Sequence, residues 1–90
     1  MNAQGKKEIY IVKRNGQREP LDINKVHKMT EAACGDLPGV SSSLVEMNSG
    51  LQFSDGMTTA QIQEILIRSA NDLISLESPN YQYVAARLLL

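Results

Sequence analysis

The longest uninterrupted helical period in this 90-residue sequence follows Thr58, and it sets the strongest limit on the fold. Thr58 to Gln61 matches a capping box, in which the Thr and Gln side chains each satisfy a free backbone N–H at the other's position. The residues after it repeat at spacings of three and four, which predicts an amphipathic helix. They are Ile62, Ile65, Leu66, Ser69, Ala70, Leu73 and Ile74. Because this helix has one apolar face to bury, other elements must pack against it.

Two further helices are predicted before this one. The first runs from Ile23 to about Cys34, with Asp22 as its N-cap and Gly35 just beyond its end. Ser43 to Glu46 matches a second capping box and begins the next helix. Apolar residues of that helix also follow at spacings of three and four, namely Leu44, Met47 and Leu51.

A final helix is predicted after a break at Glu77 to Asn80. Ser78 serves as its N-cap and Pro79 as its first residue, where the missing proline N–H does no harm. Its repeating face consists of Tyr81, Val84, Ala85, Leu88 and Leu89. The helical pattern reaches the last residue without a C-cap, so we expect the sequence to be an N-terminal fragment of a longer chain.

A short β-hairpin is predicted before the helices. Ile9 to Val12 is a β-branched and aromatic run, which favours a strand. Asn15-Gly16 predicts a type I′ turn, because both central residues of that turn need a positive φ. Glu19 to Leu21 is the expected return strand, with Pro20 at an edge because it lacks an N–H.

The length of the chain allows one small domain. We expect residues 9–90 to form it and residues 1–8 to be a flexible N-terminal tail. No apolar run approaches the ~20 residues of a membrane span, and no secretory leader is recognisable. The single Cys34 cannot form an internal disulfide, and one Cys with one His cannot build a structural zinc site. A reducing, cytoplasmic setting is therefore expected.

The formal net charge of −1 is unevenly distributed along the chain. Up to Thr30 there are seven basic and three acidic residues, a net charge of +4. From Glu31 onward two basic residues face seven acidic ones, a net charge of −5. This asymmetry suggests that an anion meets the N-terminal segment, although a mixed, solvated surface accounts for the same charges.

No catalytic constellation occurs in the sequence. His27 lacks a Ser or Cys nucleophile with a supporting acid at a recognisable spacing, and it fits a surface or packing residue. Cys34 fits a small buried residue, and the Gly-rich phosphate loops of known nucleotide-binding motifs are missing. We therefore expect no catalytic residue and no metal site in this chain.

Basic residues gather instead around the predicted hairpin and the start of the first helix. They are Lys13, Arg14, Arg18, Lys25 and Lys28. A helix N-terminus favours an anion through its free N–H groups and its dipole, and Thr59 can add a hydroxyl at the start of another helix. Such a convergence suits a polyphosphate. Lys and Arg at a hairpin tip that serve solubility alone are the other interpretation.

Three segments resemble parts of one known domain family. Val12 to Gly16, followed by Leu21 to Val26, resembles the opening of the ATP-cone, in which a basic turn precedes a Lys on the first helix. Phe53 to Ile62 is similar to its second block, in which Asp-Gly and a Thr precede the third helix. Pro79 to Leu88 is similar to the segment where the cone joins the body of class I ribonucleotide reductase large subunits. The sequence thus resembles the ATP-cone domain at the N-terminus of the class I (aerobic) ribonucleoside-diphosphate reductase large (alpha) subunit.

The resemblance implies an α+β, mainly α fold, a four-helix bundle capped by a small N-terminal β-hairpin or sheet. It implies an allosteric domain that binds ATP, which leaves the reductase active, or dATP, which inhibits it, together with Mg²⁺. The nucleotide would set the overall activity of deoxyribonucleotide synthesis for DNA replication through subunit assembly. The full-length chain would be an oxidoreductase, while this segment carries no catalytic residue.

The resemblance also implies which residues bind the nucleotide. These are Lys13, Arg14, Glu19, Pro20, Leu21, Asp22, Ile23, Asn24, Lys25 and Thr59. Further candidates are His27, Lys28 and Phe53. Another basic contact of the family lies beyond Leu90.

Besides ATP or dATP, the implied partners are the remainder of the reductase large subunit and, in the inhibited assembly, the radical-generating small subunit or another large subunit. No membrane partner is expected. No nucleic acid is expected either, because the net charge is slightly negative and no predicted helix carries clustered Arg or Asn. Two alternatives stay open. One is a degenerate cone that keeps the fold without binding nucleotide, and the other is a small helical module for protein or nucleic-acid interactions.

Overall fold

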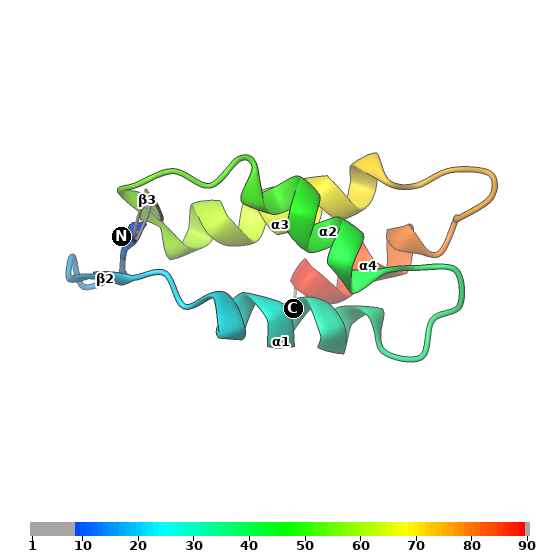
Figure 1. Ribbon diagram of the computed structural model, residues 1–90, viewed down its shortest axis with the longest axis horizontal. Helices are drawn as coiled ribbons and strands as arrows, with labels where there is room; N and C mark the ends of the chain where they lie inside the picture. Colours follow the sequence, from blue (N-terminus) through cyan, green and yellow to red (C-terminus); the bar gives the residue numbers. More distant parts are fainter. Residues whose placement is uncertain (1–8, 90) are drawn as a thin grey trace, which may run out of the picture.

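A three-stranded sheet caps one end of an elongated helical bundle (Figure 1). The computed structural model describes residues 9–89, so the tail expected at residues 1–8 and the last residue, Leu90, lie outside it. In chain order the elements are β1 (Tyr10–Val12), β2 (Arg18–Pro20), α1 (Ile23–Cys34), α2 (Ser42–Gly50), β3 (Met57–Thr58), α3 (Thr59–Asp72) and α4 (Tyr81–Leu89). The predicted α+β, mainly α architecture is confirmed.

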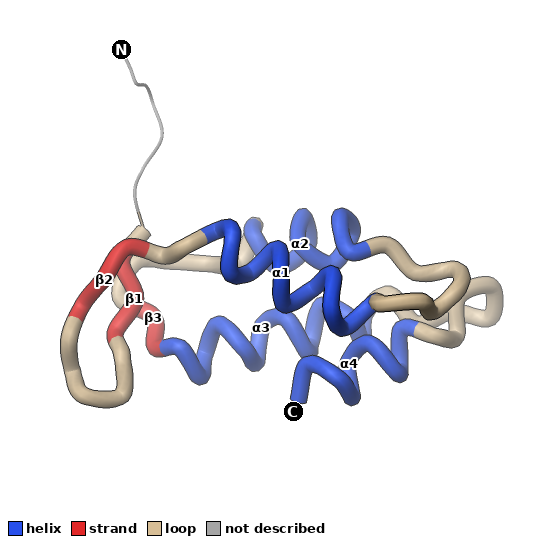
Figure 2. The backbone as a smooth tube through the Cα atoms, turned by 90° about the horizontal axis from the view of Figure 1, so that it is seen from below, coloured by secondary structure: helices blue, strands red, loops and turns tan. Residues whose placement is uncertain are grey.

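The sheet has the strand order β2-β1-β3 (Figure 2). β1 pairs with β2 in the antiparallel sense, with Ile11 opposite Glu19, as the predicted hairpin requires. β1 also pairs in parallel with the two-residue β3, which the sequence pattern did not predict. The central strand therefore pairs with one segment that follows it closely and with another that comes much later in the sequence.

The turn of the hairpin differs from the predicted type I′ turn. The Gly16 N–H donates to the Lys13 carbonyl at 2.8 Å, so Arg14 and Asn15 occupy the central positions and Gly16 closes the turn with φ 88°. The Lys13 N–H in turn donates to the Gln17 carbonyl at 2.8 Å. The prediction of Asn15-Gly16 as the central pair was wrong, because the loop is longer and needs a positive φ at its last residue.

The caps of α1 and α3 agree with the prediction. Asp22 accepts a hydrogen bond from the Asn24 N–H at 3.0 Å, and Gly35 ends α1 with φ 47°. At α3 the Thr58 hydroxyl accepts from the Gln61 N–H at 3.1 Å, while the Gln61 side chain accepts from the Thr58 N–H at 2.9 Å. Both helices consequently begin at fixed points beside the sheet.

The start and the buried face of α2 differ from the prediction. Its N-cap is Ser41 and not Ser43, and Val45 and Ser49 are its buried residues. The Glu46 carboxylate accepts a hydrogen bond from the Thr30 hydroxyl of α1 at 2.9 Å and does not close a capping box. This contact orients α2, so the apolar residues with the helical spacing are exposed instead of buried: Leu44, Met47 and Leu51.

The last helix begins two residues later than predicted. Ser78, Pro79 and Asn80 belong to the preceding loop, and α4 starts at Tyr81. The Ser78 N–H donates to the Ser75 hydroxyl at 3.0 Å, and the Asn80 side chain donates to the Pro38 carbonyl at 3.0 Å. These bonds hold the residues in a turn and delay the helix.

The core is built almost wholly from aliphatic side chains. α1 and α3 each pack against both α2 and α4, and Leu66, Val45 and Val84 are completely buried among them. Ile11 joins this core from the sheet, and Cys34 is buried in it as predicted. No helix among the described residues is long and apolar enough to cross a membrane.

Candidate functional site

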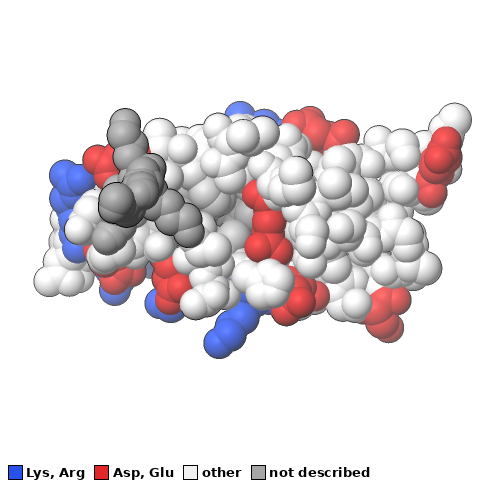
Figure 3. All heavy atoms as spheres, in the orientation of Figure 1, with Lys and Arg blue, Asp and Glu red and all other residues white. Residues whose placement is uncertain are grey.

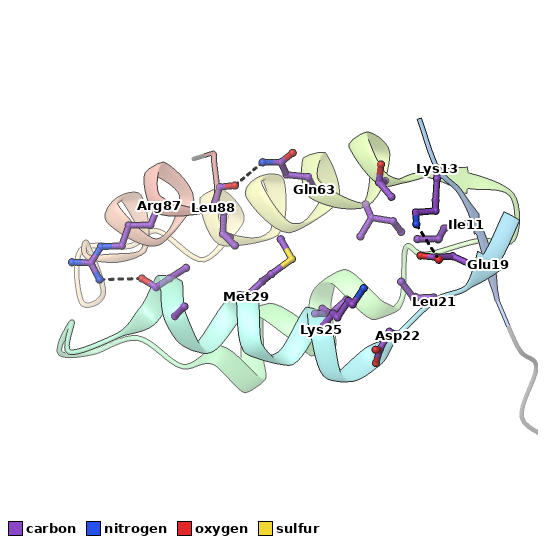
Figure 4. Close-up of a pocket in the computed structure, with 15 residues that line it drawn as sticks. Ile11, Lys13, Glu19, Leu21, Asp22, Lys25, Met29, Gln63, Arg87 and Leu88 are labelled. Atoms are coloured by element: carbon purple, nitrogen blue, oxygen red, sulfur yellow. Dashed lines mark hydrogen bonds and ion pairs between the residues drawn. The ribbon is translucent and has the colours of Figure 1, made fainter. Parts of the chain in front are cut away.

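A pocket of about 730 Å³ opens where the sheet meets α1, α3 and α4 (Figure 4). Its polar lining comes from every one of these elements: Lys13, Glu19, Asp22, Lys25, Thr59, Gln63 and Arg87. Its apolar lining is Ile11, Leu21, Val26, Met29, Ala32, Ala33, Ile62 and Leu88. The volume falls in the range of small-molecule sites, roughly 300–1,000 Å³, and the mixture of apolar walls with a few polar groups is typical of them.

The end of the pocket near the hairpin carries two lysines. Lys13 follows β1, and Lys25 lies in the first turn of α1. The Lys13 ammonium is 3.5 Å from the Glu19 carboxylate, and both side chains are partly exposed. Figure 4 shows this pair across the pocket from Lys25 and Asp22. An incoming anion would compete with Glu19 for Lys13.

The start of α3 adds a second anion-binding feature at the same end. Thr59 is the first residue of α3 and lines the pocket. A helix N-terminus presents free backbone N–H groups and the positive end of the helix dipole, which together favour phosphate or carboxylate groups. The reciprocal capping bonds of Thr58 and Gln61 fix this terminus in place.

The far end of the pocket is closed by contacts between helices. The Arg87 guanidinium of α4 donates to the Ala33 carbonyl of α1 at 3.2 Å, and the Gln63 side chain of α3 donates to the Leu88 carbonyl of α4 at 2.9 Å. The guanidinium also lies against Gly35, where an added Cβ would meet it at 3.0 Å. These bonds join three helices around the cavity.

Six of the residues predicted for the site line this pocket: Lys13, Glu19, Leu21, Asp22, Lys25 and Thr59. Seven others do not: Arg14, Pro20, Ile23, Asn24, His27, Lys28 and Phe53. Arg14 lies in the hairpin turn, Pro20 pairs with Tyr10, and Phe53 packs against the core. Ile23, Asn24 and Lys28 lie on α1, where the side chain of Ile23 is exposed.

His27 forms a separate cluster between α1 and α2. Its Nδ1 is 2.9 Å from Glu46 Oε2, and its Nε2 is 3.3 Å from Glu31 Oε2. The hydrogen bond to Glu46 and the negative charges of Glu31 and Glu46 raise the pKa of His27 above 6.5. The imidazole thus links α1 and α2, and its partners are carboxylates rather than a nucleophile.

Cys34 and the acidic residues also have no catalytic arrangement in the described part of the chain. Burial raises the pKa of the Cys34 thiol, which disfavours the reactive thiolate. Residues 9–89 contain no group of three or more His, Cys, Asp and Glu that could hold a metal ion.

Sequence reasoning missed the lining residues contributed by the packing of helices. Gln63 is one turn after Thr59, so the helical period alone could have placed it on the same side of α3. Arg87 belongs to the last segment of the resemblance, but its place in the pocket depends on how α4 packs against α1. The apolar wall on α1 consists of Val26, Met29, Ala32 and Ala33.

The charge distribution follows the predicted asymmetry. Figure 3 shows Lys and Arg gathered mainly toward the hairpin end of one face, while the charged side chains at the opposite end of that face are acidic. Lys13, which lines the pocket, belongs to the hairpin at this basic end. A negatively charged ligand is thereby favoured at this end of the molecule.

The chain is similar to a known domain family and to several curated proteins. A family model described as the ATP cone domain matches residues 9–90. The chain is 50% identical over 82 residues to the ribonucleoside-diphosphate reductase subunit alpha of Helicobacter pylori strain 26695, covering 91% of the chain and 10% of that protein. The corresponding subunit of Haemophilus influenzae is 43% identical over 84 residues, with coverage of 93% and 11%.

The ribonucleoside-diphosphate reductase 1 subunit alpha of Escherichia coli K12 is also 43% identical, over 82 residues, with coverage of 91% and 11%. The chain therefore spans about a tenth of the length of the curated relatives it matches.

Proposed function

Because this chain belongs to the ATP-cone family, we propose that it is a nucleotide-sensing regulatory domain that binds ATP or dATP in the pocket between the hairpin and helices α1, α3 and α4. One observation carries the proposal: Lys13 of the hairpin loop, Lys25 of α1 and Thr59 of α3 line one cavity. Two ammonium groups and a helix N-terminus are the donors that a triphosphate requires.

We propose that the triphosphate occupies the hairpin end of the pocket and the nucleoside the apolar remainder. The Lys13 ammonium would leave its ion pair with Glu19 and bind phosphate oxygens, and the first turn of α3 would add backbone N–H donors. Val26, Met29 and Ile62 supply the apolar surface that a purine ring can contact.

Magnesium fits this arrangement only as a companion of the nucleotide. Mg²⁺ is normally bound by substrate phosphates with one or two carboxylates, and it keeps several waters. Glu19 and Asp22 line the pocket and are the carboxylates that could assist, directly or through water. The ion would neutralise part of the triphosphate charge.

The regulatory role follows from the difference between the two nucleotides. ATP and dATP differ only in the ribose 2′-hydroxyl, so a response that distinguishes them requires this group to favour one conformation or assembly over another. A coupling of about 1–3 kcal/mol per site is typical of allosteric proteins. We propose that the chain forms the start of a cytoplasmic ribonucleoside-diphosphate reductase alpha subunit and controls deoxyribonucleotide synthesis through assembly with its other subunits.

Isothermal titration calorimetry on the 90-residue chain tests the proposal. ATP and dATP, each with Mg²⁺, are expected to bind at one saturable site, whereas a single-stranded DNA of the same phosphate concentration should release no heat. Absence of heat with both nucleotides would contradict a sensor and favour a degenerate cone. Salt-sensitive binding of DNA without binding of ATP would favour a nucleic-acid module.

A further inference from the structure

Asp55 lies in the loop before β3, outside the pocket lining, and both of its carboxylate oxygens contact the hairpin. Its Oδ1 accepts a hydrogen bond from the Tyr10 N–H at 2.8 Å, and its Oδ2 is 3.3 Å from the Arg18 guanidinium. We propose that Asp55 is the positioning residue of the nucleotide pocket, which sets the placement of Lys13, Glu19 and Thr59 relative to one another. This inference rests on the proposed function, because it assigns Asp55 a task in that same site.

Each segment that Asp55 joins leads to a polar residue of the pocket. Tyr10 begins β1, and Lys13 follows the end of that strand. Arg18 begins β2, where Glu19 is the next residue. Asp55 itself comes shortly before β3, which continues without a break into α3 and Thr59. A shift of one segment would therefore separate these pocket residues.

The sheet needs such a fixed point because its parallel pairing is very short. β1 and β3 are matched only at Ile11 with Met57 and Val12 with Thr58. Isolated pairings of this length are not stable by themselves in water. The Gly56 N–H adds a bond of 2.8 Å to the Tyr10 carbonyl, so the Asp55-Gly56 pair binds both backbone groups of Tyr10.

The geometry also explains why a carboxylate stands at this position. A carboxylate that accepts from a backbone N–H forms a charge-assisted bond, and its second oxygen is free for a guanidinium. Arg18 is further located by the Tyr10 ring, with its guanidinium carbon 5.8 Å from the ring centroid. Asn in place of Asp55 would keep the acceptor for Tyr10 but lose the ion pair.

Calorimetry on a double-mutant cycle tests the positioning role. Asp55→Ala is expected to weaken the binding of ATP with Mg²⁺ about tenfold, the effect of one lost charge-assisted bond. Lys13→Ala should weaken the binding of ATP strongly in the wild-type background and much less in the Asp55→Ala background, because a displaced Lys13 contributes little to binding. Additive losses would overturn the inference, since a merely structural residue would not alter the contribution of Lys13.

Two further variants separate this role from a general loss of stability. Asp72→Ala removes the same charge at the far end of α3 and should leave the affinity for ATP unchanged. Asp55→Asn should fall between wild type and Asp55→Ala, and Arg18→Gln should resemble Asp55→Asn. These milder variants keep the inference testable if Asp55→Ala fails to fold; wild-type affinity in both of them would contradict it.

Hydrogen exchange of the Tyr10 amide without nucleotide gives a readout that does not depend on binding. Loss of the Asp55 acceptor should accelerate this exchange about tenfold, while amides in the middle of α3 keep their rates. Unchanged exchange at Tyr10 would overturn the positioning role. If Asp55→Ala binds ATP as tightly as the wild type does, the positioning role is overturned and the proposed function stays intact. If the wild type binds neither nucleotide, the proposed function itself is overturned.

Discussion

Lys13 is the residue on which phosphate binding should depend most directly. It directly follows β1 and lines the pocket, and among the described residues it forms an ion pair only with Glu19, at 3.5 Å. Charge-assisted hydrogen bonds contribute about 1.5–3 kcal/mol, so Lys13→Ala should weaken both ATP and dATP by roughly 10- to 100-fold. Calorimetry measures this loss. Arg68→Ala is the matched control, because Arg68 pairs with Glu64 on α3 outside the pocket; equal losses in both variants would argue against Lys13 as a phosphate ligand.

His27 should make the stability of the domain depend on pH. Its pKa is raised in the folded protein by Glu46 and Glu31, so its charged form is stabilised by folding. That contribution is complete below the ordinary pKa of 6.5 and is lost as the pH rises through the higher folded value. The difference in free energy of unfolding between wild type and His27→Gln should therefore be larger near pH 5.5 than near pH 8.5. The lower pH is about one unit above the ordinary pKa of carboxylates, so these stay charged, and the higher pH is about two units above the ordinary pKa of His.

Urea denaturation at the two pH values measures this difference. Glu31→Gln with Glu46→Gln provides the control, because without both acids the effect of His27→Gln should no longer change with pH. A wild-type advantage that grows toward high pH would have the wrong sign for this cluster.

At the level of single residues, the sequence predicted the pocket only where chemistry is local. Lys13, Lys25 and Thr59 follow from the basic turn and the helix starts, and the resemblance adds Glu19. Gln63 and Arg87 enter the cavity through the packing of α3 and α4, which no spacing along the chain describes. The resemblance made His27 a candidate, but it pairs with carboxylates on α1 and α2 and does not line the pocket.

Among the elements, the start of α3 serves stability and binding through two adjacent threonines. Thr58 is the N-cap, with its hydroxyl on the Gln61 N–H, while Thr59 lines the pocket. Thr58→Ala should lower the free energy of unfolding by about 1 kcal/mol, the usual loss for a missing cap. Thr59→Ala should change the free energy of unfolding little and should weaken the binding of ATP instead. Urea denaturation and calorimetry on both variants measure the separation, and a larger loss of stability in Thr59→Ala would reverse the assignment.

The elements that could be predicted were those with complete local signals. α1 has a cap, a period and a defined end, and its bounds followed from the sequence. α3 begins as predicted after the Thr58 cap but ends at Asp72, before the predicted Leu73 and Ile74. The helix α2 has the right spacing in Leu44, Met47 and Leu51, yet these side chains are exposed, because the bond from Thr30 to Glu46 and the burial of Val45 decide which face turns inward. The strand β3 consists of two residues, and it forms only because the fold brings them beside the distant β1, so no local sequence pattern predicts it.

For the whole molecule, nucleotide binding should appear as thermal stability. A ligand that binds only the folded state at 100 times its Kd stabilises that state by about 2.7 kcal/mol. In a domain of this size each kcal/mol raises Tm by roughly 4–8 °C. Differential scanning calorimetry with ATP and Mg²⁺ should therefore show a clear rise in Tm, and Lys13→Ala at the same ATP concentration should show much less. A wild-type Tm that ATP leaves unchanged at this saturation would mean that the unfolded chain binds equally well.

The contact between Asp55 and Tyr10 joins residues 45 positions apart, and this separation has a consequence for folding kinetics. Contacts between neighbouring helices such as α1 and α2 close short loops, whereas the pairing of β1 with β3 closes a long one, which is entropically slower. We therefore expect the helical pairs to form before the sheet. Since Lys13, Glu19 and Thr59 meet only through the sheet, a partly folded chain would have helices but no nucleotide affinity, and ATP would select the completed fold.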